Sequence, residues 1–582
     1  MRAIFARAWM AALFALATLL ASPALAQEQG APAPSASAEA DAAPPAETPP
    51  EKEKSALGKF NAFMFENLFF DVLGGAVTVP EVNYKNEPVL DPKTGEQKIK
   101  TVAFPFLVMV LALGAIFFTF WYRFINLRAF KHAIDVVRGR YDDPDDEGEI
   151  SHFHALTSAL SATVGLGNIA GVAVAIVTGG PGAVVWMMIL AVFGMTAKFS
   201  SCTLAQLYRQ VNPDGSISGG PMYYLDIGLK KINPAAGVLG KILGVIYAFM
   251  VMGGALGGGN MFQANQTVEA LCSSFGMTVK GTSGEMIPDP TAAWVIGVVM
   301  AVLVAAVILG GIKRIGAATS KIVPAMVAIY VFGSVAVILF NIGKLPSSVA
   351  LMFNMAFSKS AFHGGVMGVL VTGVQRAAFS NEAGIGSASI AHAAAKTDEP
   401  VREGMVAMLG PFIDTIVVCF MTAMVVIITD TWNNEAVLTG PMQGASITAD
   451  AFGTVFSWFP YVLAVSITLF AYSTMISWCY YGERGWIYLL DHFNGAGLKS
   501  VIVFRVIFVL AVVVGAVNKL GDVLDFSDIM ILSMAFPNII GSIILAPRVL
   551  ERLKTYWGRY TSGEMLTYEQ RLAKKKGAEP AS

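Results

Sequence analysis

Charged side chains are scarce in this sequence. Asp, Glu, Lys and Arg make up 14% of its 582 residues, whereas soluble domains have about 25%. The formal net charge is −1, so no excess of positive charge favours nucleic acid as a partner. Hydrophobic residues make up 55% of the chain. This balance indicates a polytopic membrane protein.

Cysteine and the signatures of catalysis are also scarce. Four cysteines are scattered through apolar segments without metal-ligand spacing. The sequence has no Gly-Lys-Ser or Gly-Lys-Thr phosphate loop. No Ser/His/Asp order and no paired catalytic carboxylates can be placed at one membrane face. We therefore expect no direct use of ATP, no cofactor and no enzymatic activity.

The amino-terminal region differs in composition from the rest. Residues 1–26 carry two arginines, a short apolar run and Ala24-Leu25-Ala26, which predicts a cleaved secretory signal peptide. An uncleaved anchor helix is the alternative. Residues 27–55, rich in Ala, Pro and Glu, predict a disordered periplasmic tether. Residues 56–102 predict an amphipathic region at the outer face.

The remainder of the chain contains eleven apolar stretches near the roughly twenty residues that a membrane helix needs. We expect membrane segments at 103–123, 155–179, 182–208, 239–270, 291–311, 321–341, 364–395, 402–429, 447–480, 500–517 and 526–547.

Basic residues set the expected orientation. Lys and Arg follow every odd-numbered segment, and residues 549–582 form a basic tail, whereas residues 430–446 contain neither Lys nor Arg. Because basic loops remain cytoplasmic, we expect a periplasmic amino terminus and a cytoplasmic carboxyl terminus in a bacterial inner membrane. The predicted signal peptide requires the same orientation.

Two segments are interrupted at membrane depth, by SATVGLGNIAGV (161–172) and by VQRAAFSNEAGIGSASIAHA (374–393). Irregular backbone survives in hydrocarbon only where it lines a cavity or is buried in protein. If the first segment and its loop (103–152) are set aside, ten segments remain as two sets of five, 153–345 and 346–548. Each set starts with an interrupted helix, and the two helices run in opposite directions. This pattern predicts an inverted repeat of a transporter.

Neutral oxygens at the breaks suit a small zwitterion and a monovalent cation. Thr163, Ser380 and Asn381 supply such oxygens, and Asn168 and Ser387 are expected to cap the restarting helices. The free amino-terminal amides of a half-helix favour an anion, and the free carbonyls favour a cation. The structural alternative is that these residues only cap kinks.

Several ionisable groups lie within the predicted segments. Glu382 could pair with an ammonium group, accept a proton or hydrogen-bond the unwound backbone. For Lys198, Arg376, His392 and Asp414, mutual pairing near helix ends is a sufficient explanation. Proton coupling through Glu382 or His392 therefore remains open.

Two further segments carry polar residues. In the fourth, Gln263 and Asn265 are about 200° apart around a helix, so at most one faces a substrate. In the ninth, Ser473 and Thr474 precede Trp478, which shares a helix face with Thr474. Hydroxyls that bond back to their own helix are the structural alternative here.

The stretches 161–187, 218–229, 259–266, 374–395 and 470–485 resemble the alanine or glycine:cation symporter family, and the resemblance covers roughly residues 60–555. It implies an all-α, LeuT-type fold of five plus five inverted helices after one extra helix. It also implies sodium-driven uptake of a small neutral amino acid. One departure is Val185 and Met188, where the family prefers Phe and Trp.

The resemblance also implies binding residues. Those for the substrate are Gly165, Gly167, Gln263, Asn265, Ser380, Asn381, Gly384, Gly386 and Trp478. Those for sodium are Thr163, Asn168, Ser380, Ser473 and Thr474. The expected function is sodium-coupled symport of alanine, glycine or a similar amino acid by alternating access. A proton-coupled transporter and a transporter-like sensor or channel are the alternatives.

Overall fold

The computed structural model describes residues 105–281, 286–357, 366–434, 444–493, 495–518 and 521–575, and short pieces between residues 59 and 101. The predicted signal peptide (1–26) and tether (27–55) lie outside the described residues. So does much of the predicted outer-face region, within which β1 (Thr78–Pro80) pairs antiparallel with β2 (Ile99–Thr101).

Helices make up the body of the protein, and each of the eleven predicted segments is occupied by helix. In chain order the helices are α3 (Phe106–Trp121), α4 (Ile125–Arg128), α5 (Phe130–Val137), α6 (His152–Thr163), η1 (Gly167–Gly171), α7 (Val172–Gly179), α8 (Ala183–Leu207), α9 (Pro221–Tyr223), η2 (Tyr224–Gly228), α10 (Pro234–Leu256), η3 (Gly257–Met261), α11 (Phe262–Phe275), α12 (Pro290–Ile308), α13 (Gly311–Phe340), η4 (Ile342–Lys344), α14 (Leu345–Phe357), α15 (Val366–Asn381), α16 (Ala388–His392), α17 (Pro400–Ala407), α18 (Leu409–Pro411), η6 (Phe412–Cys419), α19 (Phe420–Ile428), η7 (Thr431–Asn433), α21 (Ala445–Gly453), α22 (Phe459–Phe493), α23 (Gly497–Val517), α24 (Gly521–Ser533), α25 (Ala535–Thr561) and α26 (Tyr568–Lys575). Two further hairpins pair β3 (Gln210–Val211) with β4 (Ile217–Ser218) and β5 (Thr278–Lys280) with β6 (Met286–Pro288).

Within the described residues, eight helices are long and apolar enough to cross a membrane, and a bent pair, α6 with η1–α7, makes up to nine. α3 is apolar but shorter. The protein is therefore a multi-pass, all-helical membrane protein. The count of eleven spans remains a prediction.

The predicted ninth segment, 447–480, has the wrong boundaries. Residues 445–453 form the separate helix α21, and the long helix α22 runs from Phe459 to Phe493. The hydropathy of the two pieces is continuous, so the sequence did not reveal the intervening turn. As a result, Thr474 and Trp478 lie near the middle of α22 and not at its end.

Local signals explain where several helices begin. The Asn233 side chain accepts a hydrogen bond from Ala236 N at 2.7 Å, and Asp289 caps α12 in the same way through Thr291 N and Ala292 N. Both helices have proline at their first position, where its missing N–H costs nothing.

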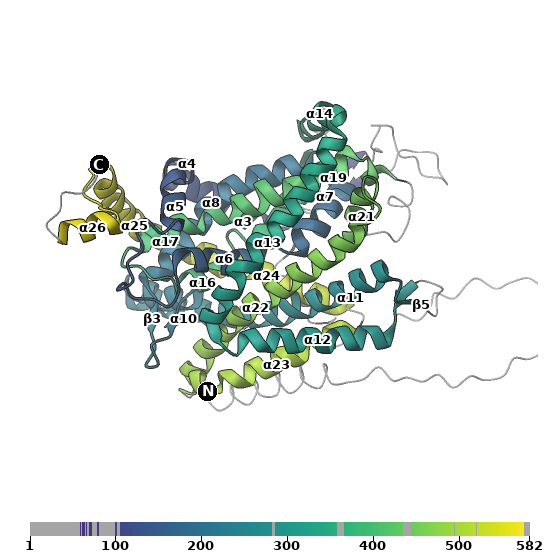
Figure 1. Cartoon of the computed structure of the whole chain (residues 1–582). Coiled ribbons are helices and arrows are strands. Elements are labelled where there is room, and N and C mark those ends of the chain that lie inside the picture. The colour runs from purple at the N-terminus through teal and green to yellow at the C-terminus, as the bar shows by residue number, and fades with distance from the viewer. Residues whose placement is uncertain are drawn as a thin grey trace, which may run out of the picture.

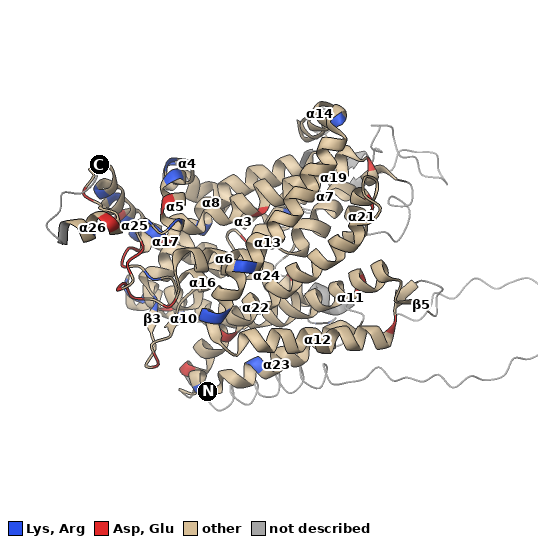
Figure 2. Cartoon of the chain, viewed as in Figure 1, with Lys and Arg blue, Asp and Glu red and all other residues tan. Residues whose placement is uncertain are grey.

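The loops that follow the odd-numbered segments gather at one end of the bundle, where most of the Lys and Arg residues of Figure 2 lie (Figures 1 and 2). Arg209 donates to Glu147 O at 2.7 Å and to Ala395 O at 2.7 Å, and Arg571 pairs with Asp143 at 3.0 Å. These contacts join loops far apart in the sequence. We call this the basic end, defined by α4, α5, residues 141–150, residues 394–399 and α26.

Helices at equivalent positions of the two predicted sets pack against each other. α8 packs on α17, α10 on α22, and α12 on α23. The first interrupted helix contacts the second in crossed order, because α6 packs on α16 and α7 on α15. The half before the break in one interrupted helix thus packs on the half after the break in the other. The two interrupted helices therefore lie side by side and antiparallel.

The carboxyl-terminal helices dock onto the basic end. The His132 ring bonds the Tyr556 hydroxyl at 2.7 Å and lies against the Tyr560 ring, and Tyr568 N donates to Arg140 O at 2.9 Å. His132 on α5 is 2% exposed. Its burial lowers its pKa to about 4, and the nearby positive charge of Arg402 adds to this effect.

This buried histidine predicts acid sensitivity of the docked tail. The folded state holds His132 neutral down to about pH 4, whereas an unfolded histidine takes up a proton near pH 6.5. Stability is therefore lost as pH falls from about 6.5 towards 4. Between pH 7 and pH 5, His132→Gln should lose less thermal stability than the wild type in detergent.

The control for this measurement is His154→Gln, a half-buried histidine on α6. It should keep the wild-type pH profile. The same pH dependence in His132→Gln and in the wild type would contradict the assignment.

Candidate functional site

The first break separates α6 from η1 and bends the chain by 56°. Asn168 is fully buried, and its Oδ1 accepts a hydrogen bond from Gly165 N at 2.8 Å. Its side chain thus reaches back to an unwound amide, and the expected cap of the restarting helix is wrong. Gly165 itself leaves little room, because a Cβ there would lie 3.1 Å from Thr474 Oγ1.

The second break lies between α15 and α16. Glu382, Gly384 and Gly386 have φ values of 53°, 89° and 93°, in the left-handed region that glycine adopts without penalty. Asn538 from α25 donates to Gly384 O at 2.7 Å. A Cβ on Gly386 would lie 2.8 Å from the Asn538 side chain. The break is therefore packed too closely for side chains at its glycines.

Ser387 does not cap α16, contrary to expectation. It occupies the residue before the helix but makes no capping hydrogen bond. Its hydroxyl donates instead to the buried Glu382 carboxylate. The carboxylate of Glu382 therefore bonds to a side chain within the break, and this bond differs from the expected one to the unwound backbone.

The two breaks meet at a third element, η6. Asn168 Nδ2 donates to Asp414 Oδ2 at 2.8 Å and to Ser380 Oγ at 3.1 Å. Ser380 Oγ and Thr415 Oγ1 donate to Asp414 Oδ1 at 2.5 and 2.9 Å. All four residues are buried. This Asn168–Ser380–Asp414 cluster joins both interrupted helices through one carboxylate.

Asp414 is the residue of this cluster that sequence reasoning missed as a site residue. The expected mutual pairing of Lys198, Arg376, His392 and Asp414 is confirmed only in part: Lys198 and Asp414 attract each other electrostatically, but the direct contacts of the described side chains go to other residues. Lys198 Nζ donates to Asn381 O at 3.0 Å, and His392 contacts Glu403. The sequence did signal Asp414 as an acidic residue within a predicted membrane segment. Its partners Ser380 and Asn168 could not be inferred, because they lie 34 and 246 positions away.

Helix α22 touches the first break. Thr474 Oγ1 donates to Ser161 O at 3.0 Å, and Ser161 Oγ donates to Ser473 O. The Ser473 hydroxyl bonds back to Phe470 O at 2.9 Å, and Thr163 bonds to Ala159 O of its own helix at 3.3 Å. Thr474 therefore bridges two helices, whereas the hydroxyls of Ser473 and Thr163 bond to their own helices, which is the structural alternative considered for Ser473.

Trp478 wedges α22 against the glycine-rich η3. Trp478 is 2% exposed. A Cβ added to Gly259 would lie 2.4 Å from the Cβ of Trp478. One turn further, Gln263 is buried; its Nε2 donates to Gly258 O at 3.0 Å, and its Oε1 has no hydrogen-bond partner among the described residues. Asn265 is half-buried and donates to Asn518 O at 3.1 Å. The two amides thus have different surroundings, as their angular separation predicted.

Comparison with known proteins identifies the family of this chain. Residues 94–570 match the model of the sodium:alanine symporter family. The chain belongs to the sodium:alanine symporter family. Its members are transporters, so this protein is a transporter and not an enzyme.

Individual relatives of this family can be compared directly. The chain is 41% identical to the sodium/alanine symporter AgcS of Methanococcus maripaludis over 453 residues, which is 78% of this chain and 94% of that protein. It is 38% identical to an uncharacterized transporter of Haemophilus influenzae over 78% of this chain and 93% of that protein. The crystal structure of MhsT in complex with L-phenylalanine is similar with a TM-score of 0.45 and 14% identity, over 69% of this chain and 98% of that chain.

The cluster predicts a specific cost for removing the charge of Asp414. In Asp414→Asn, an NH2 group replaces one carboxylate oxygen. Its hydrogens then face the donor hydrogens of Asn168, Ser380 or Thr415, and at least one hydrogen bond is lost. A mismatched buried polar group costs about 1–3 kcal/mol. The purified variant should therefore show a lower thermal midpoint in detergent. Asp450→Asn on the exposed side of α21 is the matched control and should melt as the wild type does.

Proposed function

We propose that this protein is a sodium-coupled symporter for a small neutral amino acid, such as alanine or glycine, that works by alternating access. We further propose a LeuT-type fold in which residues 153–345 and 346–548 are inverted repeats after one extra helix. Family membership supports the transport class. The meeting of both broken helices at the Asn168–Ser380–Asp414 cluster is the observation that carries the proposal.

The chemistry of this cluster suits sodium. Ser380, Asp414 and Thr415 bring hydroxyl and carboxylate oxygens together in a buried place, and hard cations prefer oxygen ligands. Within the described residues, no group of three or more His, Cys, Asp or Glu side chains suits another metal. Sodium is the transported ion here, and its charge would balance the buried Asp414 carboxylate.

We assign a second role in sodium binding to the α6–α22 contact. Thr474 Oγ1 and the Ser161 carbonyl lie 3.0 Å apart beside Gly165. Ser473 and Thr163 are retained as candidates from the sequence, although their hydroxyls bond to their own helices. Because each oxygen comes from a different element, an ion bound here would hold α22 against the first break.

The proposed substrate site comprises the backbone of both breaks, at Gly165, Gly167, Gly384 and Gly386, with Ser380, Asn381, Gln263 and Trp478 around it. Free amides at a break favour the carboxylate of an amino acid. Gln263 is a better candidate than Asn265 because its buried Oε1 is available to accept an ammonium hydrogen. The space-filling Trp478 favours a small side chain on the substrate.

We place the basic end in the cytoplasm and the opposite end in the periplasm, within a bacterial inner membrane. An ion entering down about 100 mV then contributes roughly 2.3 kcal/mol, enough for about fiftyfold accumulation. Proton coupling and a sensor or channel role are the competing functions. At the two breaks, no contact of the described residues favours either of them over symport.

The test is uptake of labelled alanine and glycine into liposomes that contain the purified protein. We expect saturable uptake with an inward sodium gradient and none with potassium in its place. Uptake driven by a proton gradient alone would replace sodium coupling with proton coupling. Binding without uptake under any gradient would indicate a sensor.

The proposed sodium ligands can be tested individually. Asn168→Ala and Thr474→Ala should each raise the sodium concentration for half-maximal uptake about tenfold, which corresponds to about 1.4 kcal/mol. Thr474→Ser keeps the hydroxyl and should retain most of the sodium affinity.

The matched control is Ser466→Ala, whose buried hydroxyl on the same helix bonds only to Val462 O at 2.8 Å. It should keep wild-type sodium dependence. Normal sodium dependence in both Asn168→Ala and Thr474→Ala would show that the ion binds elsewhere.

A further inference from the structure

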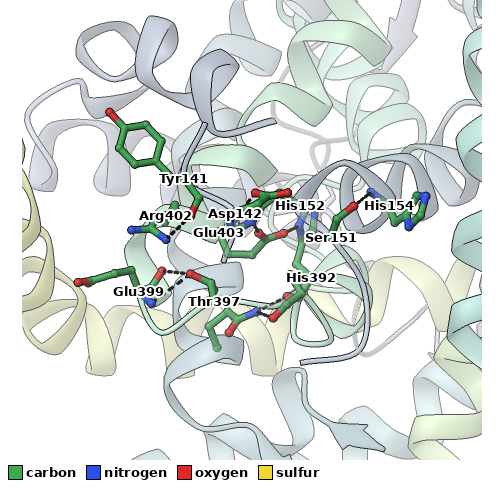
Figure 3. A network of polar contacts seen from close by, with 12 residues as sticks. Tyr141, Asp142, Ser151, His152, His154, His392, Thr397, Glu399, Arg402 and Glu403 are labelled. Atoms are coloured by element: carbon green, nitrogen blue, oxygen red, sulfur yellow. Dashed lines mark hydrogen bonds and ion pairs between the residues drawn. The ribbon is translucent and has the colours of Figure 1, made fainter. Parts of the chain in front are cut away.

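Three buried titratable side chains, His152, His392 and Glu403, meet at the basic end (Figure 3). Glu403 accepts hydrogen bonds at both of its carboxylate oxygens, from His392 Nδ1 at 2.5 Å and from His152 Nδ1. The exposed fractions are 0% for Glu403, 0% for His392 and 1% for His152. Nothing in the proposed sodium or substrate site uses these residues.

The three residues come from three different helices at this end. His152 is the first residue of α6, His392 is the last residue of α16, and Glu403 lies in the first turn of α17. One carboxylate therefore ties together the basic ends of both interrupted helices.

Backbone contacts seal the same place. Glu149 N donates to Ala394 O and Lys396 N donates to Ile150 O, each at 2.8 Å, which forms an isolated parallel bridge. Gln206 Nε2 donates to His392 O at 2.6 Å. Opening this end must break the bridge and pull at least one histidine away from Glu403.

The cluster has vacant positions for a proton. The Nε2 atoms of His152 and His392 are buried and have no hydrogen-bond partner among the described residues. His152 Nε2 lies 3.8 Å from Asp142 Oδ1, a buried oxygen that also lacks a hydrogen-bond partner. Asp142 belongs to the loop before α6, and burial raises its pKa.

The charge of the cluster favours such a proton. With both imidazoles neutral and donating through Nδ1, Glu403 leaves one negative charge in a fully buried place. A buried charge is costly unless it is paired, and protonating one imidazole at Nε2 makes the cluster neutral. The charged or titratable groups that face it from neighbouring elements are Asp142 in the preceding loop, Cys202 on α8, Arg209 after α8, and Arg402 on α17, which in turn faces His132 on α5.

We propose that His152, Glu403 and His392 form a proton-binding site that controls opening of the basic end. The closed arrangement binds the proton between the two helices, and opening releases it to the solution at that end. Because the coupling is reciprocal, protons on that side hold the end closed. The role in the transport cycle rests on the proposed function, with the basic end facing the cytoplasm.

The first test measures sodium-driven uptake into liposomes at fixed external pH, with internal pH set to 8 or 6, for protein oriented with its basic end inside. Wild-type uptake should fall several-fold at internal pH 6, because protons at that side hold the basic end closed. His152→Gln and His392→Gln should remove this dependence and leave the sodium requirement intact. His154→Gln, two residues along α6 and outside the cluster, should keep it.

The second test does not depend on transport. A cysteine at Ala395, which is 0% exposed in the closed arrangement, should be labelled by a thiol reagent only when this end opens. The labelling rate, divided by that of a cysteine at the exposed Ser562, should be several-fold higher at pH 8 than at pH 6. His392→Gln in the same background should make the two ratios equal.

These two measurements separate the two proposals. Failure of uptake under every gradient, with pH-dependent labelling intact, would remove the proposed function and keep the proton site. Labelling and uptake that ignore pH in the wild type would overturn the proton site, as would a pH dependence that survives in both histidine variants.

Discussion

The backbone at the two breaks must find hydrogen-bond partners inside the protein, because lipid offers none. Polar side chains meet this demand. Asn168, within the first break itself, accepts from Gly165 N, whereas Asn538 and Lys198 from other helices donate to Gly384 O and Asn381 O. Thr422 and Tyr247 similarly donate to Asn168 O and Ile385 O. The breaks are therefore held largely by tertiary contacts, which helices α8, α10, α19 and α25 supply.

The same demand explains why structure and chemistry share residues here. Asn168 accepts a hydrogen bond from Gly165 N through its Oδ1 and donates to Ser380 and Asp414 through its Nδ2. A cation that engaged these oxygens would change the bonds that hold both breaks, so its binding would reach both interrupted helices at once. The Glu403 cluster ties the same two helices at the basic end. In the proposed function, coupling between ion, substrate and opening would follow from these shared helices and would need no longer pathway.

Much of the architecture could be predicted from the sequence because it depends on local composition. Apolar length located helices at all eleven predicted segments, and Gly384 and Gly386 marked a real break with left-handed backbone. Basic residues predicted which loops gather at one end, as Arg209 and Arg571 show. The errors concern the path of the backbone: Asn168 and Ser387 bond to Gly165 and Glu382, three and five positions away, but which nearby group each side chain reaches depends on how the chain turns at the break.

The sequence by itself determined the class of the protein, its helices, the positions of the breaks and the family to which it belongs. Only the tertiary structure decided which side chains meet. Asp414 is hydrogen-bonded to Asn168, which lies 246 positions away in the sequence, and Glu403 is hydrogen-bonded to His152, which lies 251 positions away. A run of hydrophobic residues can be recognised in the local sequence. The partner of a buried polar group depends instead on which helix packs beside it. For that reason the ionisable residues could be counted in the sequence, but their partners emerged only from the fold.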